Sequence, residues 1–451
     1  MKAAPAPPET KQADRRGVGL FGAMAIGIGG MVGGGIFAVL GEAVLLAHGA
    51  TVVAFLLAGL IALLTSYSYA RLSVHYQGHG GTVTFIDAAF GIDLATGSIN
   101  LMLWLSYLVT IALYAVAFGS YALTFFHAPE PAWLRHMLIS TAIVLPLAIN
   151  LFNVEVISRA EFLIVVLKLI LLAAVIAAGL PHLQPSHFAA STWGSGLTVA
   201  AAGMVIFVAY EGFELIANAA GDVRSPESTL PRAFYGSVVL VIILYCLVAA
   251  VTVGTIPESE IAAAKDYALA AAAKPSMGSL GFTLVGISAL LATFSAINAT
   301  IYGNARLGYN LASNRELPEI LERKAWNEPV SGVLIVGLLS LLIANLIDIT
   351  AIAILASAGF LLIFAITNAA AAHLFREIGC KRWLPMLASL CCVAALLVLL
   401  GESYRDDPRA LWIFIGFLLV SVSFEWLYTR VLSKPLRLAD PARSPNEPFQ
   451  G

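Results

Sequence analysis

Long apolar stretches separated by short polar connections run along almost the whole chain. A stretch of about 20 apolar residues is long enough for a helix to cross a bilayer. Twelve such stretches lie at roughly 18–47, 50–70, 94–126, 135–152, 156–180, 196–220, 233–255, 279–311, 330–347, 351–375, 383–401 and 410–430. The first, third and eighth exceed one crossing, which indicates tilt, a break or an extension into the interface. The pattern predicts an all-α polytopic membrane protein with 12 transmembrane helices.

The composition agrees with a membrane protein. Hydrophobic residues make up 59% of the 451 residues and charged residues 12%, about half the charged share of a soluble domain. The net charge of −2 gives no sign of a nucleic-acid partner. The four cysteines and eight histidines show no metal-ligand spacing. We therefore expect the lipid bilayer as a partner, and neither a metal nor a cofactor.

The distribution of positive charge predicts the orientation. Most of the 25 Lys and Arg residues fall on one side of the membrane if the chain starts and ends there. Cytoplasmic loops carry the excess of Lys and Arg in membrane proteins. We therefore predict a multi-pass protein of the cell (plasma) membrane, with cytoplasmic tails at residues 1–16 and 432–451.

The first apolar stretch contains a dense glycine cluster. Six glycines occur in the nine residues from Gly27 to Gly35. Glycine is a poor helix former, so the cluster predicts a break in the first span. Unpaired backbone groups at membrane depth are tolerated only inside protein or along a cavity. The break itself is therefore a candidate ligand site.

The sixth stretch contains a second candidate break. Glu211 and Glu214 lie in the middle of this apolar span, with Gly212 between them. A charge at this depth costs at least about 2.5 kcal/mol. A half-helix that starts near Gly212 would place both carboxylates at its positive end and offset part of this cost. The alternative is that both acids only cap the broken helix.

The two breaks lie five spans apart, so equivalent spans would face opposite ways. Interrupted spans at matching positions of two inverted repeats indicate a transporter site near the bilayer midplane. Free N–H groups of one half-helix can bind a carboxylate, and free C=O groups of the other can bind an ammonium. Together these groups match an α-amino acid.

Several ordered motifs resemble those of the amino acid–polyamine–organocation (APC) transporters, whose first helix has a Gly-x-Gly-Ile/Val-Phe pattern. Here that segment reads Gly33-Gly34-Gly35-Ile36-Phe37. Further matches are Gly80-Gly81, Ala89-Phe90-Gly91, Tyr210-Glu211-Gly212-Phe213-Glu214, Ser225-Pro226, Leu230-Pro231-Arg232, Arg306 and Glu316-Leu317-Pro318. The resemblance covers about residues 17–430 and identifies the chain as similar to the APC amino acid permeases. Gly34 departs from the Ser or Thr of many members, and Gly221 from an acidic residue.

The resemblance implies a leucine-transporter-type fold with a 5+5 inverted repeat and broken helices 1 and 6. The repeats would span 17–180 and 193–376, followed by two helices in 381–431. The amides of Gly33, Gly34 and Gly35 would bind the substrate carboxylate. The carbonyls near Ile28, Gly29, Val208 and Glu211 would accept from its ammonium, and the side chains of Val208, Tyr210 and Glu211 would border the side-chain pocket.

Asn298 on span eight and Ser357 on span ten lie on helices that line the site in this fold. Each is a candidate either for substrate contact or for a hydrogen bond between helices.

Lys168 is the one lysine in the middle of a span. Burial disfavours the charged form of a lysine, so such a group can release a proton. The resemblance implies that its ammonium replaces sodium, and we assign Lys168 and Glu214 to coupling. A static ion pair with Glu161 or with another span is the alternative for Lys168. Hydroxyls of Ser288, Thr293 and Ser295 keep sodium open as a coupling ion.

These observations predict a secondary active transporter that moves amino acids by alternating access and is not an enzyme. We expect proton-coupled symport or sodium-independent exchange, and a homodimer is open. The alternative substrate class is polyamines or cationic amino acids, because of Glu211 and Glu214. A channel is disfavoured by the lack of a repeated filter sequence, and an intramembrane enzyme by the lack of a catalytic constellation.

Overall fold

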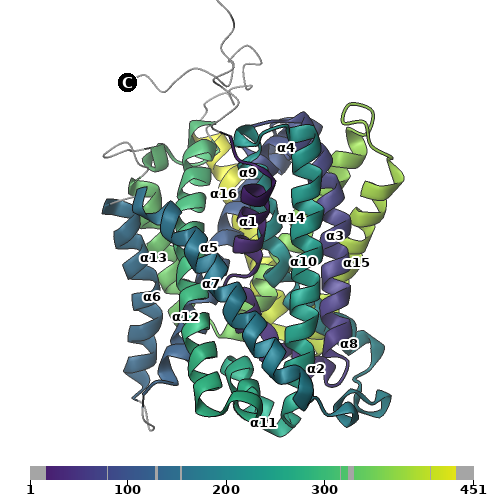
Figure 1. Ribbon diagram of the computed structural model, residues 1–451. Helices are drawn as coiled ribbons and strands as arrows, with labels where there is room; N and C mark the ends of the chain where they lie inside the picture. Colours follow the sequence, from purple (N-terminus) through teal and green to yellow (C-terminus); the bar gives the residue numbers. More distant parts are fainter. Residues whose placement is uncertain are drawn as a thin grey trace, which may run out of the picture.

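The computed structural model describes residues 17–432 except 79, 127–130, 153–154, 315, 323–329 and 407. Over these residues the protein is a bundle of helices (Figure 1). Its only β-type pairs in the described part are two isolated bridges, Val18 with Val223 and His48 with Trp193. The predicted tail 1–16 and all of the predicted tail 432–451 except residue 432 lie outside the described residues.

The α-helices follow the apolar stretches of the sequence closely. They are α1 (Leu20–Met31), α2 (Gly35–Ala47), α3 (Thr51–His75), α4 (Gly81–Phe90), α5 (Leu94–Leu123), α6 (Ala132–Phe152), α7 (Glu155–Gly179), α8 (Gly196–Ile206), α9 (Leu215–Asn218), α10 (Pro226–Thr255), α11 (Glu258–Ala263), α12 (Ala268–Ser313), α13 (Val330–Leu346), α14 (Ile349–His373), α15 (Trp383–Asp406) and α16 (Pro408–Leu432). Of the 3-10 segments, η5 (Phe207–Glu214), η7 (Lys265–Tyr267) and η8 (Glu319–Glu322) matter below.

Each of the twelve predicted spans corresponds to one or more of these helices. Ten segments in the described residues are long and apolar enough to cross a membrane, and the bent pair α1 and α2 gives an eleventh. The helix α13 has 17 residues and falls just short of this length. A multi-pass, all-helical protein is thus confirmed, whereas the count of twelve crossings and the inverted repeat stay predictions.

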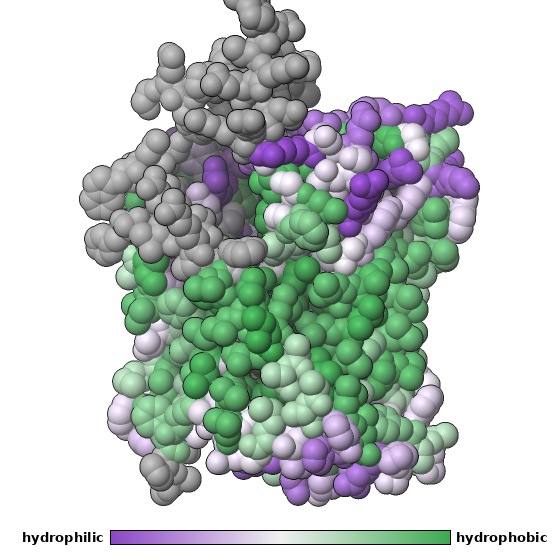
Figure 2. Space-filling view, viewed as in Figure 1, coloured by the Kyte–Doolittle hydropathy of each residue, from purple (hydrophilic) through white to green (hydrophobic). Residues whose placement is uncertain are grey.

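A hydrophobic belt surrounds the middle of the molecule on the face seen in Figure 2, with hydrophilic residues toward both ends. Large apolar side chains on the outer helices are exposed, among them Leu163, Leu338, Leu390 and Leu397. In water such a surface would be unfavourable, but lipid tails are an apolar solvent. The outer helices therefore present the bilayer-facing surface.

The centre of the bundle contains α5 and the segment from α8 to α9. In the most apolar stretch of each of these segments 89% of the residues are buried, compared with 22% in α16 and 28% in α6. The helix α5 packs against α6, α12, α13, α14 and α16. The broken spans therefore lie inside a shell of intact helices.

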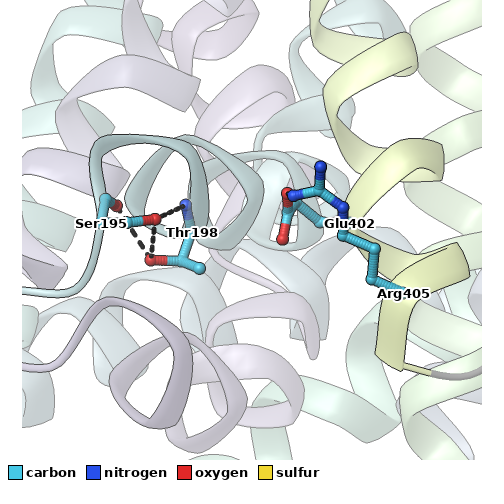
Figure 3. Close-up of polar contacts among 4 residues, drawn as sticks. All are labelled: Ser195, Thr198, Glu402 and Arg405. Carbon is cyan, nitrogen blue, oxygen red and sulfur yellow. Dashed lines mark hydrogen bonds and ion pairs between the residues drawn. The ribbon is translucent and has the colours of Figure 1, made fainter.

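Local capping fixes where two of these helices begin. Ser195 precedes α8, and its Oγ accepts from the Thr198 amide at 3.1 Å (Figure 3). Asp93 caps α5 by accepting from the amides of Ala95 and Thr96. Such caps satisfy backbone donors that the first turn leaves free. Figure 3 also shows the Arg405–Glu402 ion pair of α15, which lies near the end of that helix.

The short helix α4 was not among the predicted spans. It follows Gly80 and begins at Gly81, whose φ is +49° and whose added Cβ would lie 2.0 Å from Asn218 Oδ1. Only glycine combines this backbone conformation with such a close approach. The helix therefore packs against α9 at the upper end of the molecule in Figure 1, here called the α4 side; α11 lies at the opposite end, the α11 side.

Candidate functional site

The glycine cluster breaks the first span, as its composition predicts. The helix α1 ends at Met31, α2 starts at Gly35, and their axes differ by 49°. The Val32 amide closes α1 by donating to Ile28 O at 2.8 Å. A Cβ on Gly34 would lie 2.4 Å from the Tyr114 ring, and one on Gly33 would lie 2.9 Å from Ala296. Larger residues would thus push α5 and α12 away from the break.

The second break takes a different form from the one expected. Residues 207–214 form the 3-10 segment η5, and the α-helix that follows, α9, has only four residues. A 3-10 run of this length is uncommon and often marks a functional or strained segment. The break is therefore a long tightened turn, and no extended half-helix starts near Gly212.

The two breaks pack directly on each other through glycines. A Cβ on Gly212 would lie 2.2 Å from the carbonyl carbon of Gly30, and one on Gly30 would lie 2.8 Å from Gly212 O. One step further along, a Cβ on Gly35 would lie 2.7 Å from the Cα of Ala209. The absence of side chains at these positions allows the two irregular backbones to touch.

A cavity of about 490 Å³ lies beside this contact, between α1, α5, α7, the η5–α9 segment and α12. Gly29 and Gly30 contribute backbone to its wall, and Gly22, which is exposed, marks its mouth. The cavity therefore opens along the first half of α1. Its polar lining side chains are Tyr107, Tyr114, Glu211, Glu214, Ser295, Thr300 and Tyr302.

Glu211 is a buried carboxylate that faces the cavity with one oxygen unsatisfied. Its Oε1 accepts from the Tyr114 hydroxyl at 3.4 Å, while no hydrogen bond to Oε2 exists among the described residues. The neighbouring Thr110 hydroxyl donates to Ser106 O instead. The side chain is 4% exposed. A buried acceptor without a donor is unfavourable, so this oxygen is suited to a donor that enters the cavity.

Glu214 also lines the cavity, but unlike Glu211 it accepts several short hydrogen bonds. Three hydroxyls donate to its carboxylate: Tyr69 at 3.1 Å, Thr82 at 2.9 Å and Tyr107 at 2.5 Å. The donors come from α3, α4 and α5 respectively. Charge-assisted hydrogen bonds of this kind are among the strong ones in proteins. Glu214 therefore joins the second break to three other helices.

Lys168 contacts the first break. Its Nζ donates to Gly29 O at 3.0 Å, and the side chain is 1% exposed. The carbonyl of Gly29, one of the predicted acceptors for a substrate ammonium, thus has a protein donor in this conformation. The side chain of Glu161, the alternative partner for Lys168, lies outside the described residues.

The other predicted side chains point away from the cavity. Tyr210 donates to Phe55 O at 3.0 Å. Ser357 accepts from the Val208 amide at 3.1 Å and donates to Val205 O at 2.9 Å, so it holds the second break to α14. Asn298 accepts from Asn150 at 2.9 Å and so joins α12 to α6.

The hydroxyl groups around the two glutamates have only weak signals in the sequence. Tyr107 and Tyr114 lie seven residues apart on α5 and both reach the cavity. In the sequence alone, an aromatic stripe at this spacing favours packing over a pocket. Thr82 comes from α4, which hydropathy alone does not reveal, and Tyr69 from an ordinary apolar span. Their convergence depends on tertiary contacts.

On the α11 side of the breaks, a layer of contacts joins α2 to the segment 258–267. Lys265 forms an ion pair with Glu42 of α2 and donates to Thr350 Oγ1 of α14 at 3.3 Å. His48 at the end of α2 contacts Glu258 of α11 at 2.8 Å. The described cavity lining lies on α1, α5, α7, the η5–α9 segment and α12, whereas α2 is held by these contacts on the α11 side.

Residues 18–425 match a family model described as "Amino acid permease". The chain belongs to the amino acid permease family. The permease is 34% identical over 408 residues to the inner membrane transport protein YbaT of Escherichia coli, which covers 90% of this chain and 94% of the relative. It is 24% identical to the branched-chain amino acid permease BcaP of Bacillus subtilis over 446 residues, covering 93% and 94%.

A third relative has a different substrate in its name. The permease is 26% identical over 438 residues to the cationic amino acid transporter 7, chloroplastic, of Arabidopsis thaliana, which covers 89% of this chain and 73% of the relative. The predicted membership of the APC superfamily is confirmed by these matches. The permease is accordingly an amino acid transporter of the membrane, and the names in this family denote transporters rather than enzymes.

Proposed function

We propose that this permease is a secondary active transporter that binds an amino acid at the two helix breaks and moves it by alternating access. The observation that carries the proposal is the cavity of about 490 Å³ next to the Gly30–Gly212 contact, whose lining includes α1 from Gly22 to Gly30 and no described residue of α2 or α11. Such a one-sided cavity corresponds to one of the two states that alternating access requires.

Within this site, the amides of Gly33, Gly34 and Gly35 bind the substrate carboxylate. Gly34 and Gly35 form the start of α2, where backbone N–H groups have no partner within the helix. The carbonyls of Ile28, Gly29, Val208 and Glu211 border the ammonium. Because Gly29 O accepts from Lys168, ammonium binding there competes with the lysine.

Substrates with a second amino group, namely polyamines or cationic amino acids, are the second candidate class. The unsatisfied Glu211 Oε2 at the cavity wall favours them, because it offers a negative acceptor beyond the carbonyls. Leaving a buried acceptor without its hydrogen-bond partner costs about 1–3 kcal/mol. A cationic side chain that reaches Glu211 therefore binds more tightly than a neutral one of equal size.

The proposed test is a thermal-shift screen of the purified protein against amino acids and amines, because a bound ligand raises the unfolding midpoint. The variant Glu211→Gln keeps the size of the side chain and removes its charge. For a cationic ligand we expect affinity to fall about tenfold or more, and for a neutral ligand to change little. The control is Glu402→Gln, far from the cavity on α15. No shift with any amino acid or amine would contradict the proposed substrate class.

Transport in the proposed cycle is driven by a proton gradient or proceeds as exchange that does not require sodium. Lys168 and Glu214 are the proposed coupling groups. The Lys168 ammonium donates to Gly29 O in the last turn of α1, and Glu214 joins the second break to α4. A change of protonation at either residue would alter a contact between a break and the surrounding helices. We also propose that residues 17–180 and 193–376 form inverted repeats and that both termini of the chain are cytoplasmic.

A further inference from the structure

A second group of buried acids lies away from the cavity, where the start of α5 meets α4 and the segment after α12. The Asn100 Nδ2 atom donates to Asp87 Oδ1 at 3.0 Å and to Glu316 Oε2 at 2.9 Å. One amide of α5 thus joins carboxyl groups from two distant segments. Asn100 is 0% and Glu316 2% exposed, and Asp87 is half-buried.

A third carboxyl group approaches the same region of α5. Glu425 of α16 is 1% exposed, and a Cβ on Gly97 would lie 2.5 Å from its Oε1. Gly97 and Asn100 are three residues apart and share a helix face. Among the described residues no Lys, Arg or His forms an ion pair with Asp87, Glu316 or Glu425. Buried carboxylates without a cation are strongly disfavoured in their charged form.

The group contains acceptors that nothing in the described part of the chain satisfies. Glu316 Oε1 and Glu425 Oε2 have no hydrogen-bond partner there, and neither has Asn100 Oδ1. A carboxyl that takes up a proton loses its charge and becomes a donor. A proton is therefore the ligand that fits this group. It neutralises a carboxylate that has no cation beside it, and it reduces the repulsion between the acids.

We propose that Asp87 and Glu316 form a proton-binding site organised by Asn100, and that its proton occupancy controls how firmly α4 packs against α5. None of these residues lines the substrate cavity. The two sites are connected by α4 itself, because Thr82 in its first turn donates to Glu214 of the cavity at 2.9 Å. The site acts on the α4 side, where the cavity opens.

The pKa values give the direction of the effect. Burial raises the pKa of Asp87 to about 6. Burial, with the nearby charges of Asp87 and Glu425, raises the pKa of Glu316 to about 8. Carboxyls whose pKa is raised in one conformation stabilise that conformation at low pH. The packing of α4 is therefore firm below pH 6 and weakens as the pH rises through 6 and then 8.

Other titratable groups around the pair have their own contacts. Asp93 at the start of α5 accepts from two amides. The ring of His373 in α14 lies 5.9 Å from that of Phe90 in α4. Tyr428 of α16 donates to Leu317 O at 2.8 Å, and Glu319 of η8 also has a partner. Because the His373 ring contacts α4 directly, the test includes its variant.

The experiment is hydrogen–deuterium exchange of α4 in the full-length purified protein without substrate, from pH 5.5 to 9, corrected for the intrinsic exchange rate. In the wild type we expect protection of α4 to fall tenfold or more between pH 6 and pH 9. Glu316→Gln, which resembles the protonated acid, should remove most of this fall. Asp87→Asn provides the same test if Glu316→Gln fails to fold, and His373→Gln and the exposed Glu227→Gln should behave like the wild type.

The salt is varied among sodium, potassium and choline chloride to separate protons from metal cations. The same pH dependence in all three salts supports a proton site. Protection of α4 that is independent of pH in the wild type, or that depends on sodium rather than pH, overturns the proposal. The proposal is also overturned if the Glu316→Gln and Asp87→Asn proteins both lose protection of α4 with rising pH as the wild type does. Because no substrate is present, these outcomes do not depend on the proposed transport activity.

Discussion

Glu211 and Glu214 are three residues apart in η5, yet the structure gives them opposite surroundings. Glu214 accepts from three hydroxyls, whereas Glu211 has one long hydrogen bond and one unsatisfied oxygen. Both line the same cavity. We infer that Glu214 mainly holds the second break to its neighbours, while Glu211 is available to a substrate.

The role of Glu214 predicts a difference between two tyrosines. Tyr107→Phe removes a donor to a buried carboxylate and should lower the free energy of unfolding by about 1.5–3 kcal/mol. Tyr210→Phe removes a bond to a neutral carbonyl and should lower it by about 0.5–1.5 kcal/mol. Denaturant unfolding of the purified proteins measures both values. A loss from Tyr107→Phe no larger than that from Tyr210→Phe would show that Glu214 does not depend on this hydroxyl.

We propose that Lys168 ties coupling to the first break. We expect Lys168→Ala to lose stimulation of uptake by a pH gradient and to keep at least part of its substrate binding, because the ammonium that contacts Gly29 O is removed. Uptake into proteoliposomes with imposed gradients measures the effect. Lys274→Ala, at an exposed lysine over the Phe282 ring, is the matched control.

A sodium-driven uptake that needs no pH gradient, together with wild-type behaviour of Lys168→Ala, would contradict this role. Lys168 would then be a structural contact. The cavity-lining Ser295 and the neighbouring Thr293 would become the candidates for sodium ligands.

At the scale of elements, the contact between the two breaks depends on residues without side chains. Gly212→Ala adds a Cβ that would lie 2.2 Å from the Gly30 backbone, so we expect the breaks to separate and substrate affinity to fall at least tenfold. Gly303→Ala on α12 meets nothing within 4 Å and should be neutral or stabilise by up to about 1 kcal/mol. Ligand-induced thermal shifts on both variants test this. Wild-type affinity in Gly212→Ala would contradict the proposed site.

The sequence predicted the positions of the long helices well, because a bilayer requires continuous apolar stretches. It also located the first break, since six glycines between residues 27 and 35 leave little room for a regular helix. The ten-residue α4 could not be found by hydropathy, and it carries both Thr82 and Asp87. The position of the second break, near Gly212, was predicted from the sequence, but its 3-10 form was not.

Side-chain directions were the least predictable part of the site. Ser357 and Asn298 lie on helices expected to line it, but the structure uses both for hydrogen bonds between helices. Tyr107 and Tyr114 reach the cavity from a stripe whose spacing in the sequence favours packing. Such choices depend on which neighbour lies across the interface, and periodicity within one helix does not contain that information.

At the scale of the whole molecule, contacts on the α11 side join α2 to α11, η7 and α14, and we infer that they hold this end of the bundle closed. Lys265→Ala removes the ion pair with Glu42 and the contact with Thr350. We expect hydrogen exchange of α11 to increase up to about fivefold, as the loss of one partly exposed pair implies. Arg405→Ala, which removes the exposed pair with Glu402 shown in Figure 3, should leave α11 unchanged. Equal exchange in both variants would mean that Lys265 does not hold this side closed.

The most direct test of the account is saturable uptake of labelled amino acids into proteoliposomes, measured on the wild type and on Gly212→Ala that has been checked for folding. We predict that uptake by the wild type saturates with substrate concentration and that the variant loses it. Uptake that rises linearly without saturation, or a folded variant with wild-type kinetics, would contradict transport through a site at the two helix breaks.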